Sequence, residues 1–152
     1  MTFRKKLPFG DNTVDCIYTS HTLEHLSKAD GYQMLSESYR VLKPNGVMRV
    51  VVPDLRAIVA DYLQNKIKSD EFLIALHVGY EEDSDSRLKK LLAPFVRFPH
   101  KCMYDETRLV EIMNDIGFKA RIMKPFESEI SDIDEIEIES RTIDAVIVEG
   151  KK

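Results

Sequence analysis

Apolar residues along the chain form two short runs, each followed by a stretch with helical spacing. The runs Val14–Ser20 (VDCIYTS) and Val47–Pro53 (VMRVVVP) are rich in β-formers and follow turn signals, so each predicts a buried strand. The second run is nearly continuous in apolar residues, which is typical of a parallel strand covered on both faces. Apolar positions about 3.6 residues apart then predict a helix after each strand. The two predicted helix faces are Tyr32, Leu35, Tyr39 and Leu42, and Leu55, Ile58, Val59, Tyr62 and Leu63.

Capping and turn residues in the sequence predict where these helices begin and end. Ser27 followed by Asp30 resembles a capping box and predicts the start of the first helix. The turn Lys43-Pro44-Asn45-Gly46 ends that helix, and Asp54 is predicted to cap the second. The order strand, helix, strand, helix predicts an α/β fold.

The second half of the chain predicts a helical insertion and two further strands. Two weaker helical patterns occupy residues 69–98, and we expect this insertion to lie over one edge of the sheet. A clearer helix follows, ended by Gly117, with the apolar face Leu109, Ile112, Met113 and Ile116. Lys119–Phe126 and Thr142–Glu149 predict strands that pair antiparallel, because only a loop joins them. That loop, residues 127–140, is acidic, but its isoleucines indicate that part of it packs.

Composition describes one ordinary globular domain, residues 1–152. Of its 152 residues 43% are hydrophobic and 32% charged, and the formal net charge is −4. Lys and Arg form no basic stripe, and no apolar run reaches the ~20 residues that cross a bilayer, so we expect neither a nucleic-acid nor a membrane partner. The cysteines Cys16 and Cys102 lie far apart, with no export signal before them, so a cytoplasmic location is expected. Cys16 is interpreted as a small core residue. Arg49 lies inside the second strand and is expected to reach the sheet edge or a carboxylate such as Asp15.

The segment Ser20–Ser27 (SHTLEHLS) carries an H-x-x-E-H spacing at His21, Glu24 and His25. On a long helix this spacing sets two imidazoles one turn apart beside a carboxylate, which holds zinc in some hydrolases. Here the spacing begins where a strand ends. Three interpretations remain: a zinc hydrolase, a structural role for Glu24 and His25 in caps or hydrogen bonds, and the edge of a ligand pocket. The position favours a pocket edge, and no metal ligand is assigned.

Several of these segments resemble the class I S-adenosylmethionine-dependent methyltransferases, in particular the broad type 11 group. The resemblance rests on Leu7-Pro8-Phe9, Asp15, the pair Glu24-His25, and Leu42-Lys43-Pro44-Asn45-Gly46, where Asn45 replaces the commoner glycine. HKCMYDETRLVEIMNDIGF resembles the late helix of the family, and TIDAVIVEGKK its antiparallel final strand. The family sheet has the strand order 3-2-1-4-5-7-6. The chain is therefore expected to encode a truncated Rossmann-like sheet, strands 4-5-7-6, with a helical insertion.

The resemblance also implies a cofactor, S-adenosylmethionine, and a small-molecule methyl acceptor. The residues implied for the cofactor pocket are Leu7, Pro8, Phe9, Ser20, His21 and Thr22, the first three near the adenine. The residues implied for catalysis are His21, His25, His100 and Tyr104, because a base can remove a proton from the acceptor and histidine titrates near neutrality. His77 is placed in an amphipathic helix and interpreted as structural.

The family's glycine-rich cofactor loop has no counterpart in this sequence, whose six glycines are never closer than fifteen residues. We therefore expect the chain alone to be incomplete as a cofactor binder. Either the missing half comes from another chain or an upstream segment, or the chain is a non-catalytic partner module; the metal-dependent hydrolase is the third alternative. Without the family's first strand, Val14–Ser20 would be an open edge, so we expect a homo-oligomer or a complementary chain pairing there.

Overall fold

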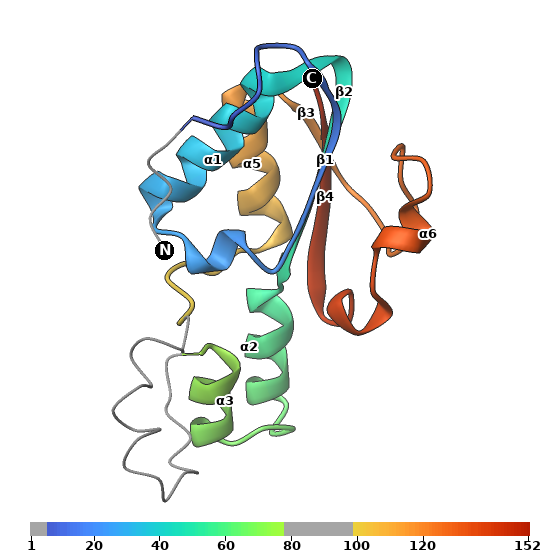
Figure 1. Ribbon diagram of the computed structural model, residues 1–152. Helices are drawn as coiled ribbons and strands as arrows, with labels where there is room; N and C mark the ends of the chain where they lie inside the picture. The colour runs from blue at the N-terminus through green and yellow to red at the C-terminus, as the bar shows by residue number, and fades with distance from the viewer. Residues whose placement is uncertain (1–5, 78–98) are drawn as a thin grey trace, which may run out of the picture.

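The computed structural model describes residues 6–77 and 99–152 and contains one mixed sheet (Figure 1). The second helical pattern of the expected insertion falls in residues 78–98, outside the described residues. The strands are β1 (Val14–Ser20), β2 (Leu42–Pro53), β3 (Lys119–Ile122) and β4 (Ala145–Lys151), and their spatial order is β1-β2-β4-β3. β1 is parallel to β2, whereas β4 is antiparallel to both β2 and β3. This confirms the expected order of strands 4-5-7-6 with an antiparallel last strand.

Two helices cover one face of this sheet. They are α1 (Lys28–Val41) and α5 (Glu106–Ile116), which lie together on one side of the strands in Figure 1. The side chain of Ser27 accepts a hydrogen bond from the backbone N–H of Asp30, which confirms the predicted start of α1. α5 ends at Gly117, whose φ of 119° is a left-handed conformation that favours glycine. The buried core on this face includes Leu35, Met48, Val50, Leu109, Met113, Val146 and Val148.

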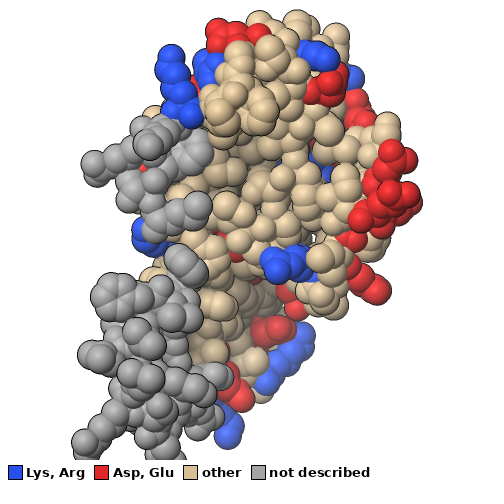
Figure 2. All heavy atoms as spheres, in the orientation of Figure 1, with Lys and Arg blue, Asp and Glu red and all other residues tan. Residues whose placement is uncertain are grey.

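The opposite face of the sheet carries the acidic segment between β3 and β4. This segment contains α6 (Ile133–Ile136) and the 3₁₀ turn η2 (Glu139–Arg141). Figure 1 shows α6 across the sheet from α1 and α5, and Figure 2 shows acidic side chains gathered at the surface there. Ile130 and Ile133 are buried, whereas Ile136 and Ile138 are exposed, so only part of the segment packs, as its isoleucines indicated.

Arg49 pairs with carboxylates, as the sequence indicated, but Asp15 is not one of them. Its fully buried guanidinium donates to Glu137 and Glu149, and Asp15 instead pairs with Lys43 at the surface. Arg49 and Asp15 lie on different faces of neighbouring strands, because Arg49 is opposite Tyr18 in the parallel register. Residues of the acidic segment therefore neutralise the buried charge, and the main-chain oxygens of Lys124 and Glu127 also accept from it.

The expectation that Cys16 is a core residue was wrong, because its side chain is exposed. Among the described strands β1 lies at the edge of the sheet, where Cys16 pairs with Val47 of β2.

Two short helices follow β2. Asp54 caps α2 (Leu55–Leu63) by accepting from the N–H of Arg56, as predicted, and α3 (Ser69–Ala75) packs beside α2 through the rings of Tyr62 and Phe72. None of the helices in the described ranges is long and apolar enough to cross a bilayer.

Candidate functional site

The carboxyl end of β1 leads into a tight turn that positions the H-x-x-E-H residues. The N–H of His21 donates to the oxygen of Val51 at 2.9 Å, which continues the pairing of β1 with β2, and the φ of His21 is 48°. The chain then forms the 3₁₀ turn η1 (Leu23–His25), not the long helix that an H-x-x-E-H zinc hydrolase needs. The hydroxyl of Ser20 is buried beside this turn and has no hydrogen-bond partner in residues 6–77 and 99–152.

Glu24 lies at the centre of the site. Its side chain is fully buried, and neither carboxylate oxygen has a hydrogen-bond partner within the described part of the chain. Oε1 is 3.5 Å from Nδ1 of His21 and 3.8 Å from Nε2 of His25. Burial is the main cause that raises the pKa of Glu24 above its ordinary value, while the neighbouring histidines act in the opposite direction. A buried carboxylate without a hydrogen bond is costly, which marks this residue as a functional candidate.

Backbone carbonyls determine which ring nitrogens of His21 and His25 carry protons. Nε2 of His21 lies 2.9 Å from the oxygen of Arg141, and Nδ1 of His25 lies 3.4 Å from the oxygen of Pro99. A carbonyl oxygen only accepts, so each of these nitrogens is the donor. In the neutral rings the other nitrogens therefore carry lone pairs, and these nitrogens face Oε1 of Glu24. Acceptor groups thus face one another, an arrangement that a proton or a cation between them stabilises.

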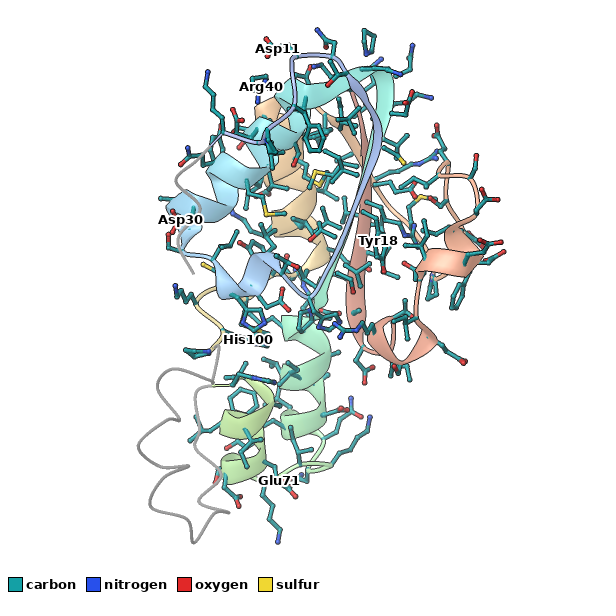
Figure 3. The ribbon with its side chains drawn as sticks, viewed as in Figure 1. Asp11, Tyr18, Asp30, Arg40, Glu71 and His100 are labelled. Carbon is teal, nitrogen blue, oxygen red and sulfur yellow. The ribbon has the colours of Figure 1, made fainter. Side chains whose placement is uncertain are left out.

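His100 joins this group from a loop far along the chain. The main-chain oxygen of Glu24 accepts hydrogen bonds from the N–H groups of Lys101, at 2.7 Å, and Cys102, at 3.1 Å, which fixes the loop against η1. The ring of His100 stacks on His77 with centroids 4.2 Å apart and meets His25 edge-on at 5.0 Å. Figure 3 shows His100 just below the η1 turn. Burial, with the neighbouring histidines, lowers the pKa of His100 to about 4, so the ring is neutral at pH 7.

All four histidines of the sequence therefore meet around Glu24. The structure brings together the predicted residues Ser20, His21, Thr22, His25 and His100. His77 also belongs to the group, although the sequence placed it in a helix; α3 ends at Ala75, and His77 follows with a φ of 54°. The sequence did not indicate the approach of His77 to His100, because no local pattern links them. The burial of Glu24 could have been suspected from its position between Leu23 and Leu26.

Two other groups of predicted residues lie elsewhere. The side chain of Tyr104 is buried in the core, and its hydroxyl lies beside Gly31 of α1. Burial is also the main cause that raises its pKa, so the hydroxyl remains protonated. Leu7, Pro8 and Phe9 precede β1 and run beside the end of α1, where the N–H of Leu7 donates to Glu37 and Arg40 donates to the oxygen of Phe9. Ser20–Thr22 lie at the opposite end of β1, about 20 Å away along the strand.

Comparison with known sequences identifies relatives of this chain. Residues 2–50, which include β1, η1, α1 and most of β2, match a family model described as a methyltransferase domain. The ubiquinone/menaquinone biosynthesis C-methyltransferase UbiE of Escherichia coli O1:K1 is 32% identical over 114 residues, and that of Cronobacter sakazakii is 34% identical over 113. These alignments cover 75% and 74% of this chain and 42% of each relative, so the chain spans less than half the length of these proteins.

Solved structures show the same fold. A methyltransferase in complex with the Haloferax volcanii activator Trm112 has a TM-score of 0.52 and 16% identity, with 99% of this chain and 59% of that chain covered. A SAM-dependent methyltransferase from Archaeoglobus fulgidus has a TM-score of 0.52 and 17% identity, with 95% and 62% covered. The sequence likeness to the UbiE enzymes over 75% of this chain and the family-model match establish the family, and the solved structures agree with it in fold. The chain belongs to the class I S-adenosylmethionine-dependent methyltransferases.

Proposed function

We propose that this chain forms the acceptor-side half of an S-adenosylmethionine-dependent methyltransferase that acts on a small molecule. The observation that carries the proposal is the group of Glu24 and four histidines at the carboxyl end of β1. Ligands of open α/β sheets bind outside the carboxyl ends of the parallel strands, so this group lies where an acceptor would bind. The family match covers the same strand and turn.

The turn after β1 fits one wall of the cofactor pocket. The buried hydroxyl of Ser20 has no hydrogen-bond partner among the residues that the structure describes, which leaves it available to a bound ligand. The hydroxyl of Thr22 donates to the main-chain oxygen of Ser20 in the same turn. S-Adenosylmethionine would supply an electrophilic methyl group there. The other wall would come from the family's glycine-rich loop, whose sequence pattern is not found here, so a second polypeptide segment would complete the pocket.

His21 is the base that we propose for the acceptor. Its Nε2 is held by the oxygen of Arg141, which fixes the ring and leaves Nδ1 as the proton acceptor beside Glu24. A proton removed from an acceptor hydroxyl would be held between Nδ1 and the Glu24 carboxylate, and the acceptor would gain the electron density needed to attack the methyl group. The related UbiE enzymes are named as C-methyltransferases, so we propose a carbon nucleophile activated by a neighbouring hydroxyl.

Calorimetric titration with S-adenosylmethionine tests whether the cofactor pocket needs both this chain and a second segment with the glycine-rich loop. The chain alone is expected to bind S-adenosylmethionine only in the millimolar range, which corresponds to about 4 kcal/mol. Adding a polypeptide with the first three strands and glycine-rich loop of a UbiE relative is expected to tighten binding by at least tenfold. Micromolar binding by the chain alone would contradict the need for a second segment. Absence of binding with both pieces present would contradict the cofactor assignment.

The exposed edge of the sheet supports a second candidate function, that of a partner module. β1 pairs only with β2 among the described strands, so one side of Val14–Ser20 presents backbone donors and acceptors to its surroundings. Such an edge favours pairing with another strand. We propose that a second copy or a complementary cofactor-binding chain pairs there, and the methyltransferase of known structure in complex with its activator shows that a chain of this fold assembles with a partner.

A further inference from the structure

The carboxylate of Glu24 and the rings of His25 and His100 form a donor set of the kind that holds a transition metal. One ligand atom from each of these residues lies within 4.8 Å of the other two. The set differs from the H-x-x-E-H pattern in the sequence, because η1 turns His21 toward Arg141 and the loop after Pro99 supplies His100 instead. We infer that Glu24, His25 and His100 bind one divalent transition-metal ion.

The unsatisfied groups at this point support the inference. Among the described residues, no hydrogen-bond partner faces either oxygen of the fully buried Glu24 or the buried Nδ1 of His100. A buried polar group without a partner costs free energy, and such a group in a native structure points to a bound ion, a water molecule or a function. A cation placed among them would satisfy three acceptor atoms at once.

The orientations of the His25 and His100 rings are also suitable for binding a metal ion. Nδ1 of His25 is directed at the oxygen of Pro99, so its Nε2 carries the lone pair that faces Glu24. Ligating histidines usually donate their second nitrogen to a carbonyl or carboxylate, which orients the ring. The ring of His100 is held in place by the stacked ring of His77, with the centroids 4.2 Å apart.

Hydrogen bonds hold the η1 turn close to the loop that carries His100. Glu24 and His25 belong to η1, and the loop that carries His100 is tied to the main-chain oxygen of Glu24 by two N–H groups. Ligand atoms on a tetrahedral ion are about 3.3 Å apart for bond lengths of 2.0–2.1 Å, so small rotations of side chains close the site. Two histidines and one carboxylate suit Zn²⁺, Co²⁺ or Fe²⁺ and leave an open position for a further ligand.

Absorption spectroscopy with Co²⁺ tests the inference on the full chain, prepared without a histidine tag. The expected result is one Co²⁺ per chain, with visible ligand-field bands that Zn²⁺ displaces. The variants His100→Gln and His25→Gln are each expected to weaken Co²⁺ binding by more than the roughly 10–100-fold typical of losing an outer-shell partner. Glu24→Gln is expected to do the same.

His21→Gln is the matched control, because His21 lies on the same turn but outside the donor set. It is expected to keep Co²⁺ binding within about threefold of the original chain. Circular dichroism checks that each variant is folded. If Glu24→Gln does not fold, the test rests on His25→Gln and His100→Gln, whose histidines are only half-buried. The inference is overturned if the chain binds no Co²⁺ or Zn²⁺ stoichiometrically, or if His100→Gln binds it as the original chain does. Neither result would bear on cofactor binding, which the titration with S-adenosylmethionine measures separately.

Discussion

Arg49 and Glu137 lie 88 positions apart in the chain and form a two-point ion pair in the interior, with Nε–Oε1 at 2.9 Å and Nη2–Oε2 at 2.8 Å. Both side chains are fully buried. Glu149 from the neighbouring strand β4 accepts from the same guanidinium at 3.0 Å. The contact holds the acidic segment against β2, on the face of the sheet opposite α1 and α5 (Figure 1).

Breaking this pair is expected to destabilise the chain strongly. Arg49→Met leaves two buried carboxylates without their cation, and Glu137→Ala leaves the guanidinium with Glu149 as its one carboxylate partner among the described residues. Each variant is expected to lower the free energy of unfolding by about 3–5 kcal/mol, measured by urea denaturation. Asp15→Asn is the control, because it breaks only the exposed pair with Lys43 and is expected to cost less than about 1 kcal/mol. An equal loss of unfolding free energy in Asp15→Asn would show that the buried pair stabilises the chain no more than the exposed pair does.

Gly150 of β4 packs against Met113 of α5 and against Phe118, which follows that helix. A Cβ at this position would be 2.6 Å from Cε of Met113 and 2.9 Å from Cβ of Phe118. Gly150→Ala is therefore expected to lower the free energy of unfolding by about 1–3 kcal/mol through overpacking. The same measurement on Gly10→Ala, whose nearest atom would be Thr13 Cγ2 at 3.2 Å, is expected to show a smaller loss. A cost for Gly150→Ala no larger than that of the control would refute the close approach.

Asp105 caps α5 by accepting from the N–H of Arg108 at 2.8 Å. Asp105→Ala is expected to cost about 1 kcal/mol of unfolding free energy at pH 7, whereas Asp105→Asn keeps an oxygen for the cap and is expected to cost less. The hydrogen bond from Arg108 is the main cause that holds the pKa of Asp105 below its ordinary value.

The stabilisation that Asp105 contributes by capping α5 is expected to depend on pH, and the direction of its pKa shift gives the sign of that dependence. Because the pKa of Asp105 is lower in the folded chain than in the unfolded one, its stabilisation is present above the unfolded value, near 3.9, and is lost as the pH falls through the folded value. The stability difference between the original chain and Asp105→Asn is therefore expected to shrink in acid. A difference that grows below pH 4 would contradict the cap.

The open edge of β1 is expected to cause association. Light scattering after size-exclusion chromatography should show a dimer or larger species whose share rises with concentration. Cys16→Lys places a charge on this edge strand and is expected to shift the chain toward monomer. Ile122→Lys places the same charge on β3, the strand at the other edge, and should leave the association unchanged. A monomer at every concentration, or equal effects of the two substitutions, would contradict pairing at β1.

The sequence predicted most of the sheet and little of the site's interior. The parallel pair β1–β2, the caps at Ser27 and Asp54 and the end of α5 at Gly117 follow from local patterns, which the structure confirms. The carboxylates that pair with Arg49 and the exposure of Cys16 were not predicted, because they depend on which segment covers each face of the sheet and on which strand lies at its edge. The approach of His100 to Glu24 depends on hydrogen bonds between segments more than seventy residues apart, for which no periodicity exists.

One measurement tests the central claim, that the turn after β1 lies in a methyltransferase pocket. S-Adenosylhomocysteine is titrated into ¹⁵N-labelled chain, and the amide shifts are mapped. We expect saturable shifts concentrated at Ser20, His21 and Thr22, with an affinity in the millimolar range. Saturation elsewhere with these three amides unmoved, or no saturable shift anywhere, would contradict the claim.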